Sequence, residues 1–211
     1  MRPLVIELNF QKNQKTLFKT VNFAGYLGVL TGMKPKKFSL TVNERFKLNG
    51  GYIGVVEWII GLRNQQWMGF LTRNVMENAD TYLEAQKLLA KTPLVSPVYF
   101  ILSGAKPFQG CIITRGRNKF DIKALNPSEQ WFLVQTNYDH WEKPPFYDDR
   151  RKPATTCLTA QGNTDLISTL FNVLSTRPVF NKLTVYTTIM QNNEGQMMTW
   201  VQECKDPCWP W

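Results

Sequence analysis

The sequence predicts an α+β fold that contains at least one antiparallel sheet. Segments with the pattern of strands and segments with the pattern of helices alternate in blocks, in the order strands, helices, strands, helices, strands. Within a block the predicted strands follow one another through short turns, and such short connections join antiparallel strands. The helical blocks can then cover sheets from outside. No internal repeat or linker divides residues 1–211, so we expect a single domain.

The first block contains three predicted strands. LVIELNF (residues 4–10) and TLFKTVNF (residues 16–23) alternate apolar and polar side chains, as a strand with one buried face does. KNQK (residues 12–15) lies between them and suits a hairpin loop. A third strand, FSLTVNERF (residues 38–46), ends in charge, and NGG (residues 49–51) marks a break after it.

The second block is predicted to be helical. YIGVVEWIIGL (residues 52–62) carries a broad apolar face, and QQWMGFLTRNVMENA (residues 65–79) repeats apolar residues at helical spacing. DTYLEAQKLLAKTP then begins with a capping box, in which the side chains of Thr81 and Glu84 each accept a hydrogen bond from the other's backbone amide. Pro93 ends this helix, because proline cannot continue one.

The remaining blocks are strands, two helices and a closing hairpin. Four strands are expected in PVYFILSG (97–104), GCIITRGR (110–117), FDIKAL (120–125) and WFLVQTN (131–137). One helix is expected from Asp148 to about Thr159, and another in TDLISTLFNVLSTRP (164–178). KLTVYTTIM (182–190) and GQMMTWVQEC (195–204) form the hairpin.

The chain is basic, with a formal net charge of +9. Its lysines and arginines are spread along the sequence, and no DNA- or RNA-reading signature accompanies them, so we expect no nucleic-acid partner. Our first interpretation is that the positive charge belongs to a solvated surface, and our second is that it binds an anionic membrane. The longest apolar run, Phe23–Met33, is too short and glycine-rich to span a membrane. The N-terminus lacks the apolar core and cleavage site of a signal peptide.

Several kinds of catalytic centre are not supported by the residue types present. His140 is the single histidine, and no G-x-S-x-G motif accompanies it, which argues against a serine–histidine–aspartate triad. No phosphate-binding glycine loop and no set of metal ligands is present, so we expect neither a cofactor nor a metal. Cys111 lies inside an apolar strand with no neighbouring histidine and is expected to be a buried structural cysteine.

Two polar residues at predicted strand ends are candidate site residues. Glu44 and Asn137 each lie where an apolar strand meets a charged turn. A side-chain amide at such a place can donate a hydrogen bond to an oxyanion without any pKa shift. The alternatives are that Asn137 begins a turn and that Glu44 forms a surface ion pair with Arg45.

The segment that precedes the helix near residue 150 offers a third candidate. Asp148 or Asp149 is expected to cap this helix, with its negative charge at the positive end of the helix dipole. Arg150 would then lie in the first turn, where the dipole disfavours a cation, and this suggests that it has a partner elsewhere. The spacing of Cys204 and Cys208 leaves open a local disulfide or two free thiols.

A resemblance to a known family covers nearly the whole chain, from about residue 3 to residue 211. The matching motifs include FAGYLGVLTGMKPKKFSLTVNERF, NGGYIGVVEWIIG, FLTRNVMENADTYLEAQKLLAKT, VYFILSG, CIITR, QTNYDHW, DDRRKPA, FNVLSTRPVFNKLTVYTT and CKDPCWPW. In these motifs the chain resembles the acid ceramidase family. The related N-acylethanolamine acid amidases share TNYDHW, DDRR and YTT, but lack the NERF form and the C-terminal cysteine pair.

The resemblance implies an N-terminal-nucleophile hydrolase fold, an αββα sandwich of antiparallel sheets. It also implies hydrolysis of ceramide to sphingosine and a fatty acid in the lysosome. Asn137 matches the asparagine that supports the oxyanion, Arg150 matches the arginine that holds the charge of the catalytic network, and Glu44 matches an active-site glutamate. Cys157 matches the cysteine that links the large (beta) subunit to the small (alpha) subunit. Cys204 and Cys208 match a disulfide.

The chain also departs from the family pattern. It begins with Met1 at a point inside the family's large subunit, so the fold is expected to be incomplete at its N-terminus, and the segment that carries the nucleophilic cysteine is absent. We therefore expect this chain alone not to hydrolyse ceramide. No N-x-Ser/Thr glycosylation site occurs.

Two alternative functions remain open, and the basic surface is expected to bind an anionic partner. The alternatives are an N-acylethanolamine acid amidase of the same fold and a non-catalytic lipid-binding or interaction protein. The expected partners of the basic surface are anionic lysosomal membrane lipids or a saposin-type activator.

Overall fold

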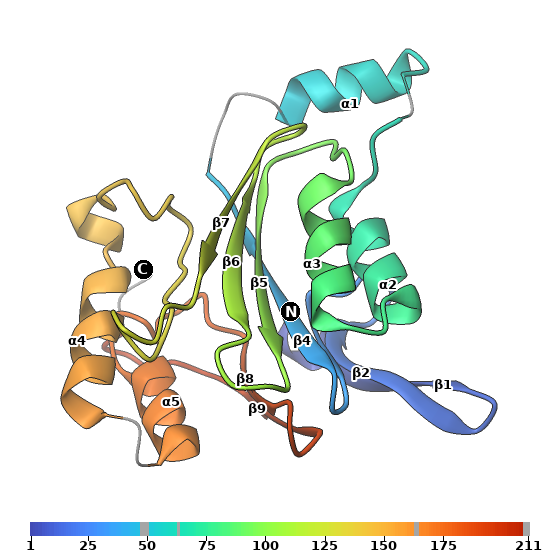
Figure 1. Ribbon diagram of the computed structural model, residues 1–211. Helices are drawn as coiled ribbons and strands as arrows, with labels where there is room; N and C mark the ends of the chain where they lie inside the picture. Colours follow the sequence, from blue (N-terminus) through green and yellow to red (C-terminus); the bar gives the residue numbers. More distant parts are fainter. Residues whose placement is uncertain (47–50, 63, 163–164, 209–211) are drawn as a thin grey trace.

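A large antiparallel sheet forms the centre of the protein (Figure 1). The computed structural model describes residues 1–46, 51–62, 64–162 and 165–208. Within these ranges, seven strands follow one another across the large sheet in chain order. They are β1 (Val5–Lys12), β2 (Lys15–Phe23), β3 (Thr31–Lys34), β4 (Phe38–Glu44), β5 (Val98–Gly104), β6 (Gly110–Arg115) and β7 (Phe120–Ala124). Every neighbouring pair is antiparallel, which confirms the expected α+β class.

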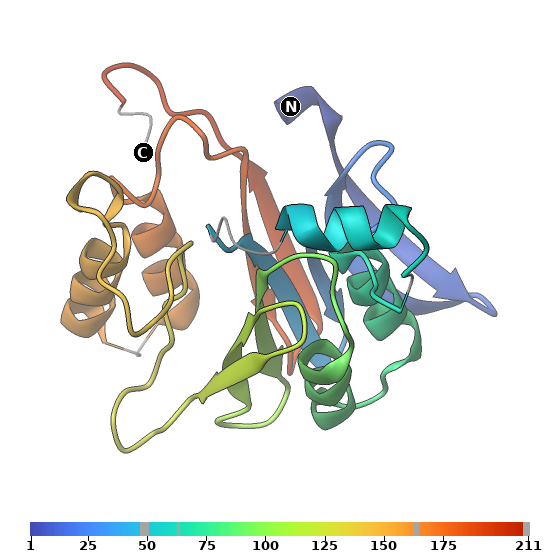
Figure 2. The ribbon, with the colours of Figure 1, turned by 90° about the horizontal axis from the view of Figure 1, so that it is seen from above.

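The structure has four layers, with helices outside and sheets inside (Figures 1 and 2). The outer layers consist of α2 (Met68–Asn78) and α3 (Tyr82–Lys91) on one side and of α4 (Arg151–Gln161) and α5 (Leu166–Ser175) on the other, and α1 (Gly51–Ile59) belongs to neither. Helices α2 and α3 cover one face of the large sheet. The other face meets the hairpin of β8 (Tyr186–Gln191) and β9 (Gln196–Val201), and α5 packs behind β8. The order of layers is therefore αββα.

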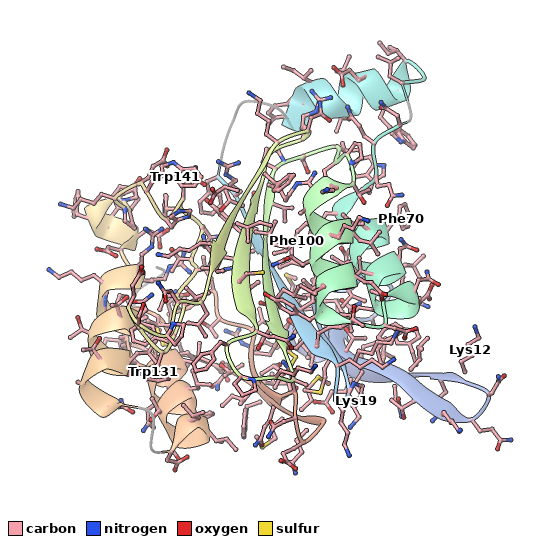
Figure 3. The ribbon with its side chains drawn as sticks, in the orientation of Figure 1. Lys12, Lys19, Phe70, Phe100, Trp131 and Trp141 are labelled. Atoms are coloured by element: carbon pink, nitrogen blue, oxygen red, sulfur yellow. A yellow bond between two sulfur atoms is a disulfide. The ribbon has the colours of Figure 1, made fainter. Side chains whose placement is uncertain are left out.

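The main core lies between the large sheet and the helices α2 and α3. Phe18 and Phe100 point from the sheet into this layer and are fully buried, as are Leu71 of α2 and Leu89 of α3 (Figure 3 labels Phe100). Full burial of each such side chain contributes about 1.5–3 kcal/mol. This layer therefore holds β4 and β5 in place, and the candidate site lies at one end of β4.

Most of the predicted elements in the first half are confirmed. The first hairpin turns at Asn13 and Gln14, whose positive φ angles of 52° and 62° suit a two-residue hairpin loop. The capping box of α3 is present, with Thr81 and Glu84 each accepting from the other's backbone amide. Two short elements were not predicted, namely β3 and the single-turn 3-10 helix at Arg2–Leu4.

Helix α1 lies at one end of the large sheet, apart from α2 and α3 (Figure 1). An ion pair between Glu57 of α1 and Arg117 attaches it to the connection between β6 and β7. None of the described helices combines the length and the apolar character needed to cross a membrane. The predicted break at residues 49–51 falls mostly outside the described residues.

The prediction of a strand at residues 131–137 is wrong. This segment has no regular secondary structure, and its apolar side chains instead pack against α4 and α5. Trp131 (labelled in Figure 3), Phe132 and Val134 contact the small core formed by Ala154, Leu158 and Val173. The apolar run is therefore partly buried against helices and not paired with a neighbouring strand.

The start of the following helix also differs from the prediction. A short 3-10 helix, Phe146–Asp148, comes first, and α4 begins at Arg151. The carboxylate of Asp149 accepts a hydrogen bond of 3.0 Å from the backbone amide of Lys152, as a capping acid does. Arg150 occupies the N-cap position, just before the first turn in which it was expected. Its side chain is therefore free to turn away from the helix.

Candidate functional site

The site forms where the end of β4 meets the segment of residues 135–139. The side-chain amide of Asn43, at the end of β4, donates hydrogen bonds of 3.1 Å to the carbonyl oxygens of Gln135 and Thr136. A side chain thus replaces the ladder of bonds that a paired strand would have made. The result is that Asn137 lies beside Glu44, although 93 positions separate the two in the sequence.

Asn137 uses both ends of its side-chain amide. Its Nδ2 donates a 2.8 Å hydrogen bond to the backbone carbonyl oxygen of Glu44. Its Oδ1 accepts a 2.7 Å hydrogen bond from the Nη2 of Arg150. These two bonds fix which end of the amide is the donor. The side chain of Glu44 is exposed, so the contact of Glu44 with this site is made by its main chain.

Arg150 is held by Asp148 as well as by Asn137. Its Nε and Nη2 donate to the two carboxylate oxygens of Asp148, at 2.8 Å and 3.3 Å. The hydroxyl of Tyr138 donates a 2.9 Å hydrogen bond to the same carboxylate. Burial and this bond raise the pKa of Tyr138 to about 12, so Tyr138 stays a neutral donor. The partner that the sequence suggested for Arg150 is thus a pair, Asn137 and Asp148.

A cavity of about 570 Å³ opens beside these groups. Its polar wall contains Asn137, Arg150, Asp148 and the neighbouring Tyr138. The other lining residues are mostly apolar or aromatic: Phe46, Tyr147, Val179, Asn181, Leu183 and Thr184. The arrangement places hydrogen-bond donors against one side of an apolar space, which suits a ligand with one polar group and apolar arms.

A second cavity of about 500 Å³ lies between the large sheet, β8 and the helices α4 and α5. Arg150, Val179 and Thr184 line both cavities, so Arg150 stands at their boundary. A third, apolar cavity shares no lining residue with these two. It is lined by residues 26–28 between β2 and β3, residues 67–70 at the start of α2, and Ser96.

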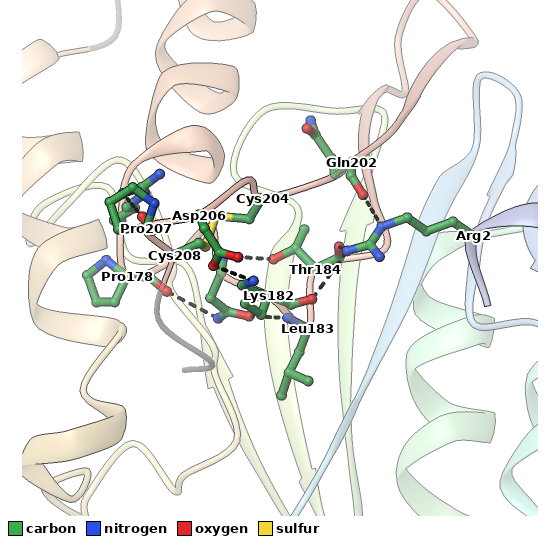
Figure 4. The surroundings of a disulfide bond; sticks show 12 residues. Arg2, Pro178, Lys182, Leu183, Thr184, Gln202, Cys204, Asp206, Pro207 and Cys208 are labelled. Carbon is green, nitrogen blue, oxygen red and sulfur yellow. Dashed lines mark hydrogen bonds and ion pairs between the residues drawn. A yellow bond between two sulfur atoms is a disulfide. The ribbon is translucent and has the colours of Figure 1, made fainter.

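The disulfide between Cys204 and Cys208 lies close to the segment of residues 182–184 (Figure 4), of which Leu183 and Thr184 line the first cavity. This is the pairing that the resemblance implies. Around it, Arg177 donates a 2.6 Å hydrogen bond to the carbonyl of Pro207, and Lys182 forms a 2.5 Å ion pair with Asp206. Residues 179–184 supply four lining residues of the cavity, and Lys182 within this segment pairs with Asp206 of the disulfide loop. The disulfide loop therefore supports one wall of the cavity.

The other cysteines lie apart from Asn137 and Arg150. Cys157 is a free, half-buried thiol on α4. Cys111 is a free, buried thiol on β6 that accepts a hydrogen bond from Gln86, and burial raises its pKa. A thiol with a raised pKa is a poor nucleophile, as expected for Cys111.

His140 lies outside the lining of both cavities. Its Nε2 is 3.7 Å from a carboxylate oxygen of Asp121, and burial is the main cause that lowers its pKa. No three His, Cys, Asp or Glu side chains come close enough to hold a metal ion in the described part of the chain.

The sequence did not reveal a buried cluster next to the site. Arg45, which we considered as a surface partner of Glu44, makes two 2.7 Å bonds to the carboxylate of Asp139. The hydroxyl of Tyr99 donates to the same carboxylate at 2.5 Å. Asp139 is 1% exposed, and Tyr99 is fully buried. These residues come from three separate segments, so no local spacing could have indicated the contact.

The chain is similar to proteins of known family. The family model "Linear amide C-N hydrolases, choloylglycine hydrolase family" matches residues 1–157. The chain is 52% identical to acid ceramidase of Heterocephalus glaber and 52% identical to acid ceramidase of Homo sapiens, over all of this chain and 54% of each relative. The chain thus spans about half the length of these relatives.

A solved structure supports the expected fold as well. It is the Caenorhabditis elegans N-acylethanolamine-hydrolyzing acid amidase ortholog, with a TM-score of 0.82 and 34% identity over 95% of this chain and 88% of that one. The expected N-terminal-nucleophile hydrolase fold is thereby confirmed. The chain belongs to the choloylglycine hydrolase family of linear amide C–N hydrolases.

Proposed function

We propose that the protein containing this chain hydrolyses the amide bond of ceramide and releases sphingosine and a fatty acid. The observation that carries this proposal is the 52% identity to acid ceramidases over the whole chain, with Asn137 and Arg150 set against an apolar cavity. Ceramide has one polar amide region between two apolar chains. Such a molecule suits a cavity with polar groups on one side only.

Asn137 is proposed to stabilise the oxyanion that forms when the amide carbonyl is attacked. A side-chain amide nitrogen carries two hydrogens, and the contact with Glu44 uses one of them. The other is available for the substrate oxygen, because no partner for it occurs among the described residues. A donor that is already oriented before the reaction costs no reorganisation during it.

Arg150 and Glu44 are proposed to orient and polarise the Asn137 amide. The guanidinium of Arg150 withdraws electron density through Oδ1, which makes the Nδ2 hydrogens better donors. Asp148 fixes that guanidinium with two hydrogen bonds. Glu44 contributes its carbonyl oxygen, which sets the rotation of the amide.

The nucleophile is proposed to come from outside these 211 residues. Cys111 is buried with a raised pKa, and Cys157 is not among the lining residues of the cavity beside Asn137. We therefore expect the isolated chain not to release sphingosine, and the complete protein to do so. Activity of the isolated chain would contradict this assignment, and loss of that activity in Cys111→Ser or Cys157→Ser would identify the nucleophile.

A second candidate substrate is an N-acylethanolamine. The observation that favours it is the 0.82 TM-score to the Caenorhabditis elegans amidase ortholog. Turnover of ceramide and of N-palmitoylethanolamine by the complete protein decides between the two. We expect the higher kcat/KM for ceramide, and the reverse order would establish the second candidate. Binding of both lipids without hydrolysis of either would support a non-catalytic lipid-binding protein.

Cys157 is proposed to link this chain to the small subunit of the mature protein. Its thiol is free and half-buried on α4, so it is accessible to a partner. Electrophoresis of the complete protein without reductant tests the link. We expect one band that separates into two on reduction in the wild type, and two bands without reductant in Cys157→Ser. Two bands without reductant in the wild type would exclude the link.

The mouth of the first cavity is proposed to meet anionic lysosomal membrane lipids, or an acidic activator of the saposin type. Tyr147 lines this cavity and is exposed, Phe146 beside it is 93% exposed, and Trp141 (labelled in Figure 3) is exposed in the same loop region. Exposed aromatic rings suit the interface between water and lipid. The net charge of +9 adds attraction to anionic headgroups. Flotation with vesicles of increasing phosphatidylserine content should show increasing binding, and binding that ignores this content would contradict the proposal.

A further inference from the structure

We infer that Arg45, Asp139 and Tyr99 form a buried clamp that sets the position of Asn137. This inference rests on the proposed function, because it assigns the three residues to the reaction through Asn137. They are positioning residues, since none of them lines the cavity beside Asn137.

The segment that carries Asn137 needs such a clamp. Residues 131–145 contain no strand or helix, so no regular ladder of backbone bonds holds them. An oxyanion donor must nevertheless stay within about 0.5 Å of its productive position. Bonds made by side chains must therefore supply the rigidity that secondary structure does not.

The end of β4 supplies these bonds residue by residue. Asn43 binds the carbonyl oxygens of residues 135 and 136, and Glu44 accepts from Asn137. Arg45 then makes its two parallel bonds to Asp139, two positions after Asn137. Three consecutive residues of one strand end thus fix the segment on both sides of the proposed oxyanion donor.

The Arg45–Asp139 pair is the strongest of these attachments. A bidentate bond between guanidinium and carboxylate fixes distance and direction together. The pair is buried, with Asp139 at 1% exposure and the Arg45 side chain at 15%. Tyr99 of β5 adds a third bond to the carboxylate, and Nη1 of Arg45 donates a 3.0 Å bond to the carbonyl of Arg115 at the end of β6. The clamp therefore connects the Asn137 segment to three neighbouring strands of the large sheet.

Consecutive side chains of residues 137–139 contact either the site or the clamp. Asn137 bonds to Arg150, Tyr138 bonds to Asp148, and Asp139 bonds to Arg45 and Tyr99. A movement of Asp139 would therefore displace Asn137, which bonds to Arg150 directly. It would also displace Tyr138, which bonds to Asp148, the other partner of Arg150. This geometry predicts an effect of the clamp on the rate of the chemical step and not on substrate binding.

The test uses the complete protein with Arg45→Lys and Asp139→Asn. Arg45→Lys keeps the charge but loses the planar fork, and Asp139→Asn keeps the shape but loses the charge. We expect kcat per folded molecule to fall about 10- to 100-fold with KM changed less than twofold, because a small misplacement of a catalytic group has that effect. Arg73→Lys is the matched control, since Arg73 pairs with Glu77 on α2.

A double-mutant comparison shows whether the clamp acts through Asn137. In an Asn137→Ala background, Arg45→Lys should lower kcat by less than a further twofold, because the donor that it positions is gone. A full additional loss in that background would overturn the inference, and so would a normal kcat in the single variants. Where Asp139→Asn fails to fold, Tyr99→Phe removes one bond only and is judged by the same criteria.

Hydrogen exchange separates this inference from the proposed function. If the wild type hydrolyses no amide, the proposed function fails, and the clamp is judged by exchange at residues 135–139 alone. Faster exchange confined to these residues in Arg45→Lys, and absent in Arg73→Lys, supports the clamp. Unchanged exchange at residues 135–139 would overturn it.

Discussion

The guanidinium of Arg150 donates a 2.7 Å hydrogen bond to the Oδ1 atom of Asn137. With Oδ1 held in this way, the Nδ2 of Asn137 donates to the backbone carbonyl oxygen of Glu44, and the residue lines the first cavity. The amide is thus oriented as a donor before any substrate is present. The predictions below follow from this relationship and from the groups that support it.

Replacing Arg150 with lysine should lower the rate of amide hydrolysis. A lysine ammonium lacks the planar fork that bonds to Asn137 and Asp148 at the same time. We expect kcat to fall about 10- to 100-fold, since Asn137 loses its orientation. Steady-state kinetics of the complete protein measures this, with Arg73→Lys as the control. A kcat within twofold of the wild type would show that Arg150 does not act on the reaction.

The Tyr138→Phe variant should change how stability depends on alkaline pH. Burial and the bond to Asp148 raise the pKa of Tyr138 to about 12, above the ordinary value of 10.0. The folded state therefore keeps this proton after the unfolded state has lost it. The contribution of Tyr138 to stability is present below pH 10 and is lost as the pH rises from 10 to 12. Denaturant unfolding should show a smaller loss over this range in Tyr138→Phe, and equal losses would contradict the assignment.

Replacing His140 with asparagine should flatten the dependence of stability on acidic pH. Burial is the main cause that lowers the pKa of His140 below its ordinary value of 6.5. The unfolded state therefore binds this proton first, so the stabilising contribution is present above pH 6.5 and is lost as the pH falls through the folded-state pKa. His140 is the single histidine of the chain. Thermal unfolding between pH 7.5 and 5 should show a shallower decline in His140→Asn, and an unchanged slope would contradict the prediction.

Removing the disulfide should destabilise the chain and the cavity wall that it supports. Cys204 and Cys208 close a short ring with a sequence separation of 4. The chain-entropy model gives about 2 kcal/mol for so short a ring. The double variant Cys204→Ser/Cys208→Ser should lose about that much free energy of unfolding and show a raised KM. Wild-type stability and KM in the variant would show that the ring supports neither.

The sequence was informative wherever local chemistry decides the structure. The capping box at Thr81 and Glu84 and the hairpin turn at Asn13 and Gln14 depend on residues close together in the chain, and both were predicted correctly. Strand β3 was missed because Gly32 interrupts its pattern and because Lys34, a charged residue, is buried. The structure explains this burial, since the ammonium of Lys34 donates to the carbonyl of Ala79 at the end of α2.

The remaining errors involve contacts between distant segments. The run from Trp131 to Val134 has the composition of a strand, but it packs, partly buried, against α4 and α5 instead. Arg45 was considered as a partner of Glu44, whereas its actual partner, Asp139, lies 94 positions away. Periodicity cannot distinguish an apolar run that is paired in a sheet from one that is covered by helices. Asn137 was chosen from a predicted strand end and Arg150 from its expected place in the first turn of a helix, and the resemblance indicated both. The structure brings the two side chains into contact.

The most direct test of the account measures sphingosine release from ceramide by the complete protein and by its Asn137→Ala variant. Asn193→Ala, in the turn between β8 and β9, is the matched control. Loss of one oxyanion donor lowers kcat about 100-fold or more in comparable enzymes, so we predict a loss of that size in Asn137→Ala with a nearly unchanged KM and wild-type kinetics in Asn193→Ala. Release by Asn137→Ala within twofold of the wild type, or no release by the wild type, would contradict the account.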